Sequence, residues 1–128
     1  RRDPLMNQQE IFEYIKKQYP ANPERITQNG KQIIIFKNQR NNIPYAIFYQ
    51  SDKSVMSIME VQAESDMISN YIEMYHFAPA KYMNQKHWLA VSMDGTVSDS
   101  KVLDMLDMSY DIVDEQEEWQ RNKKWTVG

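Results

Sequence analysis

The stretch NGKQIIIFKNQRNNIPYAIFYQSDKSVMSIMEV, residues 29–61, decides the fold of this 128-residue chain. It begins with Asn29 and Gly30, which both tolerate positive φ and favour a tight turn. Three short runs that follow are rich in β-branched and aromatic residues and are bounded by polar stretches; they are residues 32–36, 45–49 and 55–61. The pattern predicts an antiparallel meander of strands.

A helix is predicted ahead of the meander, over residues 4–18. Apolar side chains recur there at helical spacing, among them Leu5, Ile11 and Ile15. Asp3 can cap the first turn, and the helix should end before Pro20 because the residue preceding a proline avoids the helical conformation.

Two more helices and one more strand are predicted after the meander. The helices cover residues 65–75, with Ser65 as cap, and residues 99–113, with Ser98 as cap. Residues 87–93 alternate loosely between apolar and polar side chains and end at a turn, as a strand would.

These elements predict one α+β domain spanning residues 1–128. Its antiparallel sheet should have about four or five strands, with helices packed on one face. Residues 114–128 are mostly polar and are expected to form a loosely packed tail.

Composition excludes several kinds of site chemistry. The chain has no cysteine, which removes disulfides, thiolate nucleophiles and cysteine-ligated metals, and its three glycines form no phosphate-binding loop. With two histidines it has few good metal ligands. We therefore expect no enzyme activity, no catalytic residues, no metal site and no cofactor.

Hydropathy and charge bear on location and partners. The longest strongly apolar run, residues 33–36, is far shorter than the roughly 20 residues of a membrane span, and no secretory signal precedes it, so we expect a cytoplasmic protein without a membrane partner. Net charge is −3, but residues 1–50 carry an excess of Lys and Arg while the rest is acidic.

The segment after residue 81 resembles a known family. Tyr82-Met83-Asn84-Gln85-Lys86-His87-Trp88 is followed by Asp94-Gly95 and by a predicted helix ending in Ser109-Tyr110-Asp111-Ile112-Val113. This order is similar to the C-terminal signature of the MmcQ/YjbR family, except that Tyr82 stands where the family has His and Gln85 where it has the first Lys.

The resemblance covers most of the chain and carries implications for fold and function. It implies a CyaY-like or secretion-chaperone-like α+β fold with helices on one face of an antiparallel sheet. It also implies DNA binding through a "double-wing" motif. Fold-level likeness gives only a modest functional expectation.

Two groups of residues are candidates for contact with nucleic acid. Lys31, Lys37 and Arg40 flank a polar, flexible loop over residues 37–42 that could lie along a phosphate backbone; the alternative is a solvated hairpin loop. Asn84, Lys86 and His87, beside Trp88, could grip phosphate and stack on a base. The alternative is that Trp88 enters the core while Asn84 and His87 satisfy backbone groups.

Other candidates favour structure over chemistry. Ser109 and Tyr110 sit within a helix, where the hydroxyl of Ser109 can bond to a carbonyl one turn earlier, and no Gly-x-Ser-x-Gly elbow supports a hydrolase. A stripe of carboxylates on the last helix predicts a solvated acidic face, with cation binding as the alternative; it comprises Asp104, Asp107, Asp111 and Asp114. Most of the nine methionines fall on predicted core faces.

Two functions remain open on sequence alone. The leading one is a non-enzymatic DNA-binding protein that uses the basic hairpin and residues 84–88. The alternative is a protein-binding adaptor of secretion-chaperone type, in which an exposed sheet face or Trp119 and Trp125 dock a peptide. An adaptor should expose an apolar patch of several hundred Å².

Overall fold

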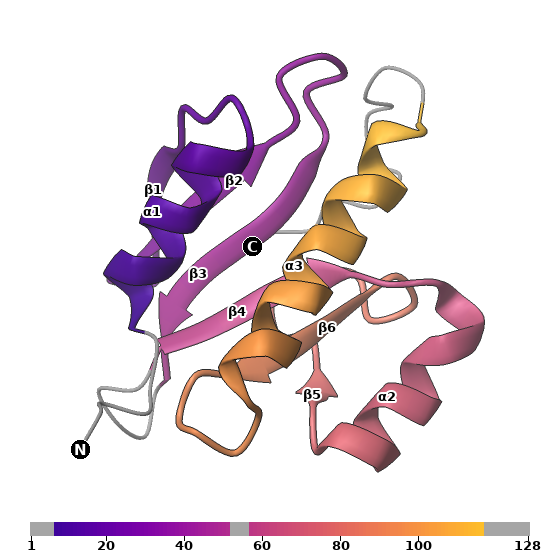
Figure 1. Ribbon diagram of the computed structural model, residues 1–128. Helices are drawn as coiled ribbons and strands as arrows, with labels where there is room; N and C mark the ends of the chain where they lie inside the picture. Colours follow the sequence, from indigo (N-terminus) through magenta and orange to yellow (C-terminus); the bar gives the residue numbers. More distant parts are fainter. Residues whose placement is uncertain (1–6, 52–56, 117–128) are drawn as a thin grey trace.

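Six antiparallel strands form one sheet in the order β1-β2-β3-β4-β6-β5 (Figure 1). The computed structural model describes residues 7–51 and 57–116. The strands are β1 Glu24–Gln28, β2 Lys31–Lys37, β3 Pro44–Gln50, β4 Ser57–Gln62, β5 Ala78–Pro79 and β6 Trp88–Ser92. The predicted meander is thus confirmed as the centre of the sheet, β2-β3-β4.

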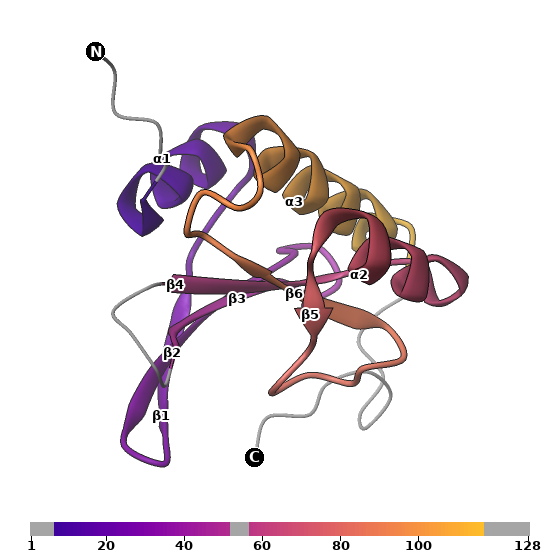
Figure 2. The same ribbon diagram turned by 90° about the horizontal axis from the view of Figure 1, so that it is seen from below.

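The helices lie on one side of this sheet, as predicted (Figure 2). They are α1 Gln8–Gln18, α2 Ile68–Tyr75, which follows the 3-10 turn η1 Ser65–Met67, and α3 Asp99–Asp114. We call the side that they cover the helical face of the sheet and the opposite side the rear face. The α+β class and the single layer of helices agree with the sequence.

The core on the helical face is built around aromatic side chains. Phe12 of α1 meets Phe36 of β2 and Phe48 of β3 edge to face, at centroid distances of 5.2 and 5.0 Å. Phe36 and Phe48 are almost fully buried. Because burying one such side chain contributes roughly 1.5–3 kcal/mol, this cluster fixes α1 on the sheet.

The rear face has an apolar cluster of its own. Ile33, Ile35 and Ile47 are buried there together with Trp88. The connection between β5 and β6 contributes the apolar side chains that pack on them, namely Ala80, Tyr82 and Met83. The sheet is therefore buried on both faces, which explains why the apolar runs of β2 and β3 are continuous.

Several details differ from the sequence prediction. The sheet has six strands, because residues 24–28, for which no strand was predicted, form β1 and the two-residue β5 adds an edge strand. Asn7 caps α1, with Glu10 completing a capping box, whereas the predicted cap Asp3 lies outside the described residues. Ser65 starts the 3-10 turn and provides no cap, but Ser98 caps α3 by accepting from the amide of Lys101.

Candidate functional site

Residues 80–87 form a tightly bonded segment on the rear face. The side chain of Asn84 accepts a hydrogen bond from the amide of Lys86 at 2.9 Å, and its carbonyl accepts one from the amide of His87 at 3.0 Å. The carbonyl of His87 accepts from the amide of Ala63 at 2.9 Å. Asn84 and His87 thus satisfy backbone groups at the start of β6, which was the structural alternative for these two residues.

Trp88 is fully buried at the beginning of β6. It belongs to the rear-face cluster, so the expectation that it enters the core is confirmed. Its indole N–H has no hydrogen-bond partner in the part of the chain that the structure describes. A base therefore cannot stack on Trp88 without unpacking this cluster.

Glu60 of β4 holds the segment to the sheet, a role that sequence reasoning missed. Its fully buried carboxylate accepts three consecutive backbone N–H groups, those of Lys81 at 2.7 Å, Tyr82 at 3.2 Å and Met83 at 3.1 Å. The hydroxyl of Tyr49 donates a fourth hydrogen bond at 2.5 Å. All the donors meet one side chain, so the position of the segment depends on it.

The environment of Glu60 acts on its pKa in two opposite ways. Burial raises the pKa of the Glu60 carboxyl above its ordinary value, because the charged form loses its hydration. The hydrogen bonds from Tyr49 and from the amides of residues 81–83 favour the charged form and oppose this shift. The hydrogen bonds from the backbone amides therefore offset the cost of burying a carboxylate at this position.

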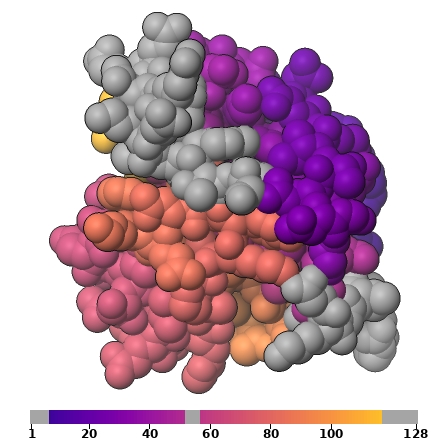
Figure 3. Space-filling model, turned by 180° about the vertical axis from the view of Figure 1, so that it is seen from behind, coloured from indigo at the N-terminus to yellow at the C-terminus, as the bar shows by residue number. Residues whose placement is uncertain are grey.

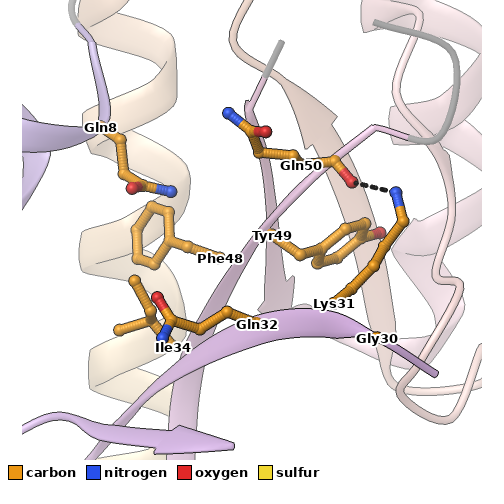
Figure 4. Close-up of a pocket in the computed structure, with 8 residues that line it drawn as sticks. All are labelled: Gln8, Gly30, Lys31, Gln32, Ile34, Phe48, Tyr49 and Gln50. Atoms are coloured by element: carbon orange, nitrogen blue, oxygen red, sulfur yellow. Dashed lines mark hydrogen bonds between the residues drawn. The ribbon is translucent and has the colours of Figure 1, made fainter. Parts of the chain in front are cut away.

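Lys31 and Lys81 each line a cavity that Tyr49 also lines. Lys31, whose ammonium group is 3.4 Å from the carbonyl oxygen of Gln50, lines a cavity of about 470 Å³ together with Tyr49 (Figure 4). A second cavity, of about 220 Å³, is lined by Tyr49 and Lys81. Glu60 accepts hydrogen bonds from Tyr49, which lines both cavities, and from the amide of Lys81, which lines the second.

Lys37 stands at the other end of β2 and is ion-paired. Its ammonium group is 3.0 Å from the carboxylate of Glu24 on β1. Glu24 and Ile26 are two residues apart on β1, so their side chains point to the same face, and Ile26 belongs to the rear-face cluster. Lys37, which contacts Glu24, is therefore on the rear face as well. Lys31 and Lys37 are six residues apart on one strand, about 20 Å, so they cannot contact the same phosphate.

The loop over residues 37–42 is bound to the end of α3. Asn41 donates to the carbonyl oxygens of Val113 and Gln116 at 2.8 and 3.1 Å. Arg40 donates to the carbonyl oxygens of Asp114 and Gln116 and lies 3.8 Å from the Asp114 carboxylate. The prediction of a flexible loop is wrong, because these polar side chains satisfy carbonyl groups that the last turn of a helix leaves unpaired.

The lysines of the rear face oppose the acidic stripe of α3. Two elements of the rear face carry these lysines. They are β2, with Lys31 and Lys37, and the segment of residues 80–87, with Lys81 and Lys86. Figure 3 shows this side, with residues 80–90 in salmon and orange. The stripe is on the helical side of the sheet, where α3 also carries Lys101 in its first turn, so the four carboxylates of the stripe and the four rear-face lysines lie on opposite sides of the sheet.

Two of the four carboxylates of the stripe accept hydrogen bonds from other elements, whereas Asp104 and Asp111 are exposed. Asp107 accepts hydrogen bonds from the hydroxyls of Tyr14 at 2.7 Å and Tyr19 at 2.5 Å, which joins α1 to α3. Asp114 accepts from the side chain of Asn38 at 2.9 Å. No cluster suited to hold a metal ion occurs within residues 7–51 and 57–116.

Ser109 lies at the helix–sheet interface and is fully buried. Its hydroxyl donates to the carbonyl oxygen of Tyr45 at 2.6 Å and accepts from the amide of Gln62 at 2.9 Å. The expected bond to a carbonyl within the helix is thus replaced by a bridge between β3 and β4. The bridge lies just beyond Ala46 and Val61, the last paired residues at this end of the two strands.

The Asp107 contacts lead to a prediction for alkaline pH. The hydrogen bond to Asp107 raises the pKa of Tyr14 to about 12, and burial followed by Asp107 raises the pKa of Tyr19. Because both folded-state values exceed the ordinary value near 10, these bonds stabilise the fold below about pH 10. We expect the contribution of these hydrogen bonds to the free energy of unfolding to be lost as pH rises through 12.

Urea unfolding at a series of alkaline pH values, with tyrosine absorbance read in parallel, measures this loss. The Asp107→Ala variant should be less stable than the wild type at pH 8 and should lose less stability between pH 10 and 12. Asp66→Ala, which removes an exposed carboxylate outside this contact, is the control. Equal alkaline losses in the wild type and in Asp107→Ala would show that the bonds contribute nothing.

Exposed apolar surface is scarce in the described part of the chain. Its exposed large apolar side chains are Met67, 36% exposed, and Met74, 64% exposed. Met59, Met83 and Met105 are buried, in agreement with their predicted core positions. Residues 7–51 and 57–116 thus lack the wide apolar patch expected of an adaptor, and Trp119 and Trp125 lie outside them.

Comparisons with known proteins identify the fold. No protein-family model and no curated protein matches the chain. A crystal structure of a protein from Pseudomonas syringae has a TM-score of 0.76 at 17% identity, covering 84% of this chain and 99% of that one. A Deinococcus radiodurans protein, described as a DUF419 domain, has a TM-score of 0.72 at 16% identity, covering 89% and 83%.

These likenesses show a shared fold with uncharacterised proteins. Membership of the MmcQ/YjbR family stays a prediction from residues 82–113. The helices in the described ranges are too short or too polar to cross a membrane.

Proposed function

We propose that the protein binds nucleic acid without catalysing a reaction, and that the lysines of the rear face make the contact. The observation that carries this proposal is that Lys31 and Lys81 each line a cavity together with Tyr49, and that no residue of the acidic α3 lines either cavity. Lys86 extends the same side along residues 80–87. Lysines placed in this way can displace counterions from a phosphate backbone while the carboxylates of α3 face away from it.

The roles of the sequence-predicted residues change under this proposal. Lys31 and Lys86 remain contact residues, and Lys81 joins them. Lys37 and Arg40 form ion pairs with Glu24 and Asp114, so their substitution would also disturb the fold. Asn84 and His87 shape the segment that carries Lys81 and Lys86.

Fluorescence anisotropy with a labelled 20-base-pair duplex tests the proposal. We expect weak binding at low salt, with a slope of log K against log salt of about −2 to −3, since each phosphate contact contributes roughly −0.9. The Lys31→Glu/Lys81→Glu variant should abolish it. Lys16→Glu/Lys17→Glu, which makes the same change of charge at the end of α1, should bind nearly as well as the wild type.

Two results would contradict the proposal. One is the absence of duplex and single-strand binding at low salt. The other is an equal loss of affinity in both double variants, because binding would then depend on net charge and not on the rear face.

A further inference from the structure

The amides of residues 81–83 point at a single anion. Three successive N–H groups that converge on one point form a backbone concavity of the kind that binds carboxylate or phosphate groups in proteins. Here the two carboxylate oxygens of Glu60 fill it, with N···O distances of 2.7 to 3.2 Å. The Tyr49 hydroxyl donates from the β3 side at 2.5 Å.

We infer that these amides and the Tyr49 hydroxyl form an anion-binding site that Glu60 occupies from within, and that Glu60 thereby positions the lysines proposed to contact nucleic acid. The second part rests on the proposed function. Glu60 is fully buried and would not touch the nucleic acid. It acts by holding Lys81 near Tyr49. The chemical class that suits this site is a small carboxylate.

The burial and the bond count separate this site from an ordinary buried polar residue. A carboxylate can accept about four hydrogen bonds, and Glu60 accepts four from the described residues. A glutamine in its place could accept through one oxygen only and would direct an NH₂ group at backbone donors. The donor set therefore suits a carboxylate better than a neutral side chain of the same size.

Chemical rescue tests the inference. In Glu60→Ala the donors remain while the carboxylate is lost, so added acetate or formate should raise the urea midpoint, as binding to the folded state alone requires. Chloride at the same ionic strength should not raise it. Met59→Ala, which creates an apolar cavity on the other face of β4, is the matched control and should gain nothing from acetate.

The same variant links the site to the proposed function. We expect Glu60→Ala to bind the labelled duplex as weakly as Lys31→Glu/Lys81→Glu does, and acetate to restore its affinity. If the wild type binds no nucleic acid but acetate still stabilises Glu60→Ala, the anion site stands and the proposed function fails. If the wild type binds and acetate has no effect, the anion site fails and the proposed function stands.

Amide hydrogen exchange in the wild type provides a test that needs no variant. The amides of residues 81–83 should be protected to the same degree as those of β4, because each is bonded to a buried acceptor. Exchange at the rate of an exposed loop would overturn the inference, even if Glu60→Ala fails to fold.

Discussion

Replacing Glu60 by alanine is expected to lower the free energy of unfolding by about 3–5 kcal/mol. The substitution leaves three buried backbone N–H groups and the Tyr49 hydroxyl without their acceptor. Each orphaned group costs about 1–3 kcal/mol, partly offset because a buried charge no longer has to be desolvated. Urea denaturation monitored by circular dichroism measures the change.

Tyr49→Phe is the graded comparison for this experiment. It removes the hydroxyl that donates to Glu60 and leaves the three amides in place. We expect a loss of about 1 kcal/mol, the usual net contribution of one hydrogen bond. If Glu60→Ala were no more destabilising than Tyr49→Phe, the amides of residues 81–83 would not depend on the carboxylate.

Replacing Ser109 by alanine is expected to cost about 2–3 kcal/mol. The hydroxyl serves a carbonyl of β3 and an amide of β4 at once, in a place that water cannot reach without opening the interface with α3. Thermal or urea unfolding measures the loss, and Ser100→Ala, on the exposed first turn of α3, should change stability by less than about 0.5 kcal/mol. A similar small effect in Ser109→Ala would mean that the bridge contributes nothing.

The layout of the fold was predictable because its central elements have strong patterns. The apolar runs of β2 and β3 are too short for helices and too continuous for loops, and the stripes of α1 and α3 recur at helical spacing. The edge strands were missed for the opposite reason. β1 has one apolar residue, Ile26, among polar ones, and β5 has two residues, one of them a proline, as edge strands often do.

The candidate site was only partly predictable, because long-range partners decide what each polar residue does. The sequence around Lys37 and Arg40 gives no sign of their partners, because folding places Glu24 next to Lys37 and the end of α3 next to Arg40. Asn38 and Asn41 look like turn formers but bond to α3 residues more than 70 positions away.

Glu60 was missed although the sequence held a signal for it. Alternation places Glu60 on the rear face. With helices expected only on the other face, the rear face was expected to be open to solvent. The continuous apolar runs of β2 and β3 already required both faces to be covered. A carboxylate on the next strand must then be buried, and a buried carboxylate needs donors.

Chemical-shift mapping during titration with the duplex tests most directly whether the rear face is the contact surface. With ¹⁵N-labelled protein at low salt, the largest changes should fall on the amides of Lys31, Lys81 and Lys86, and should shrink as salt is added. Changes concentrated on α1 or α3, with residues 80–87 unaffected, would contradict the account.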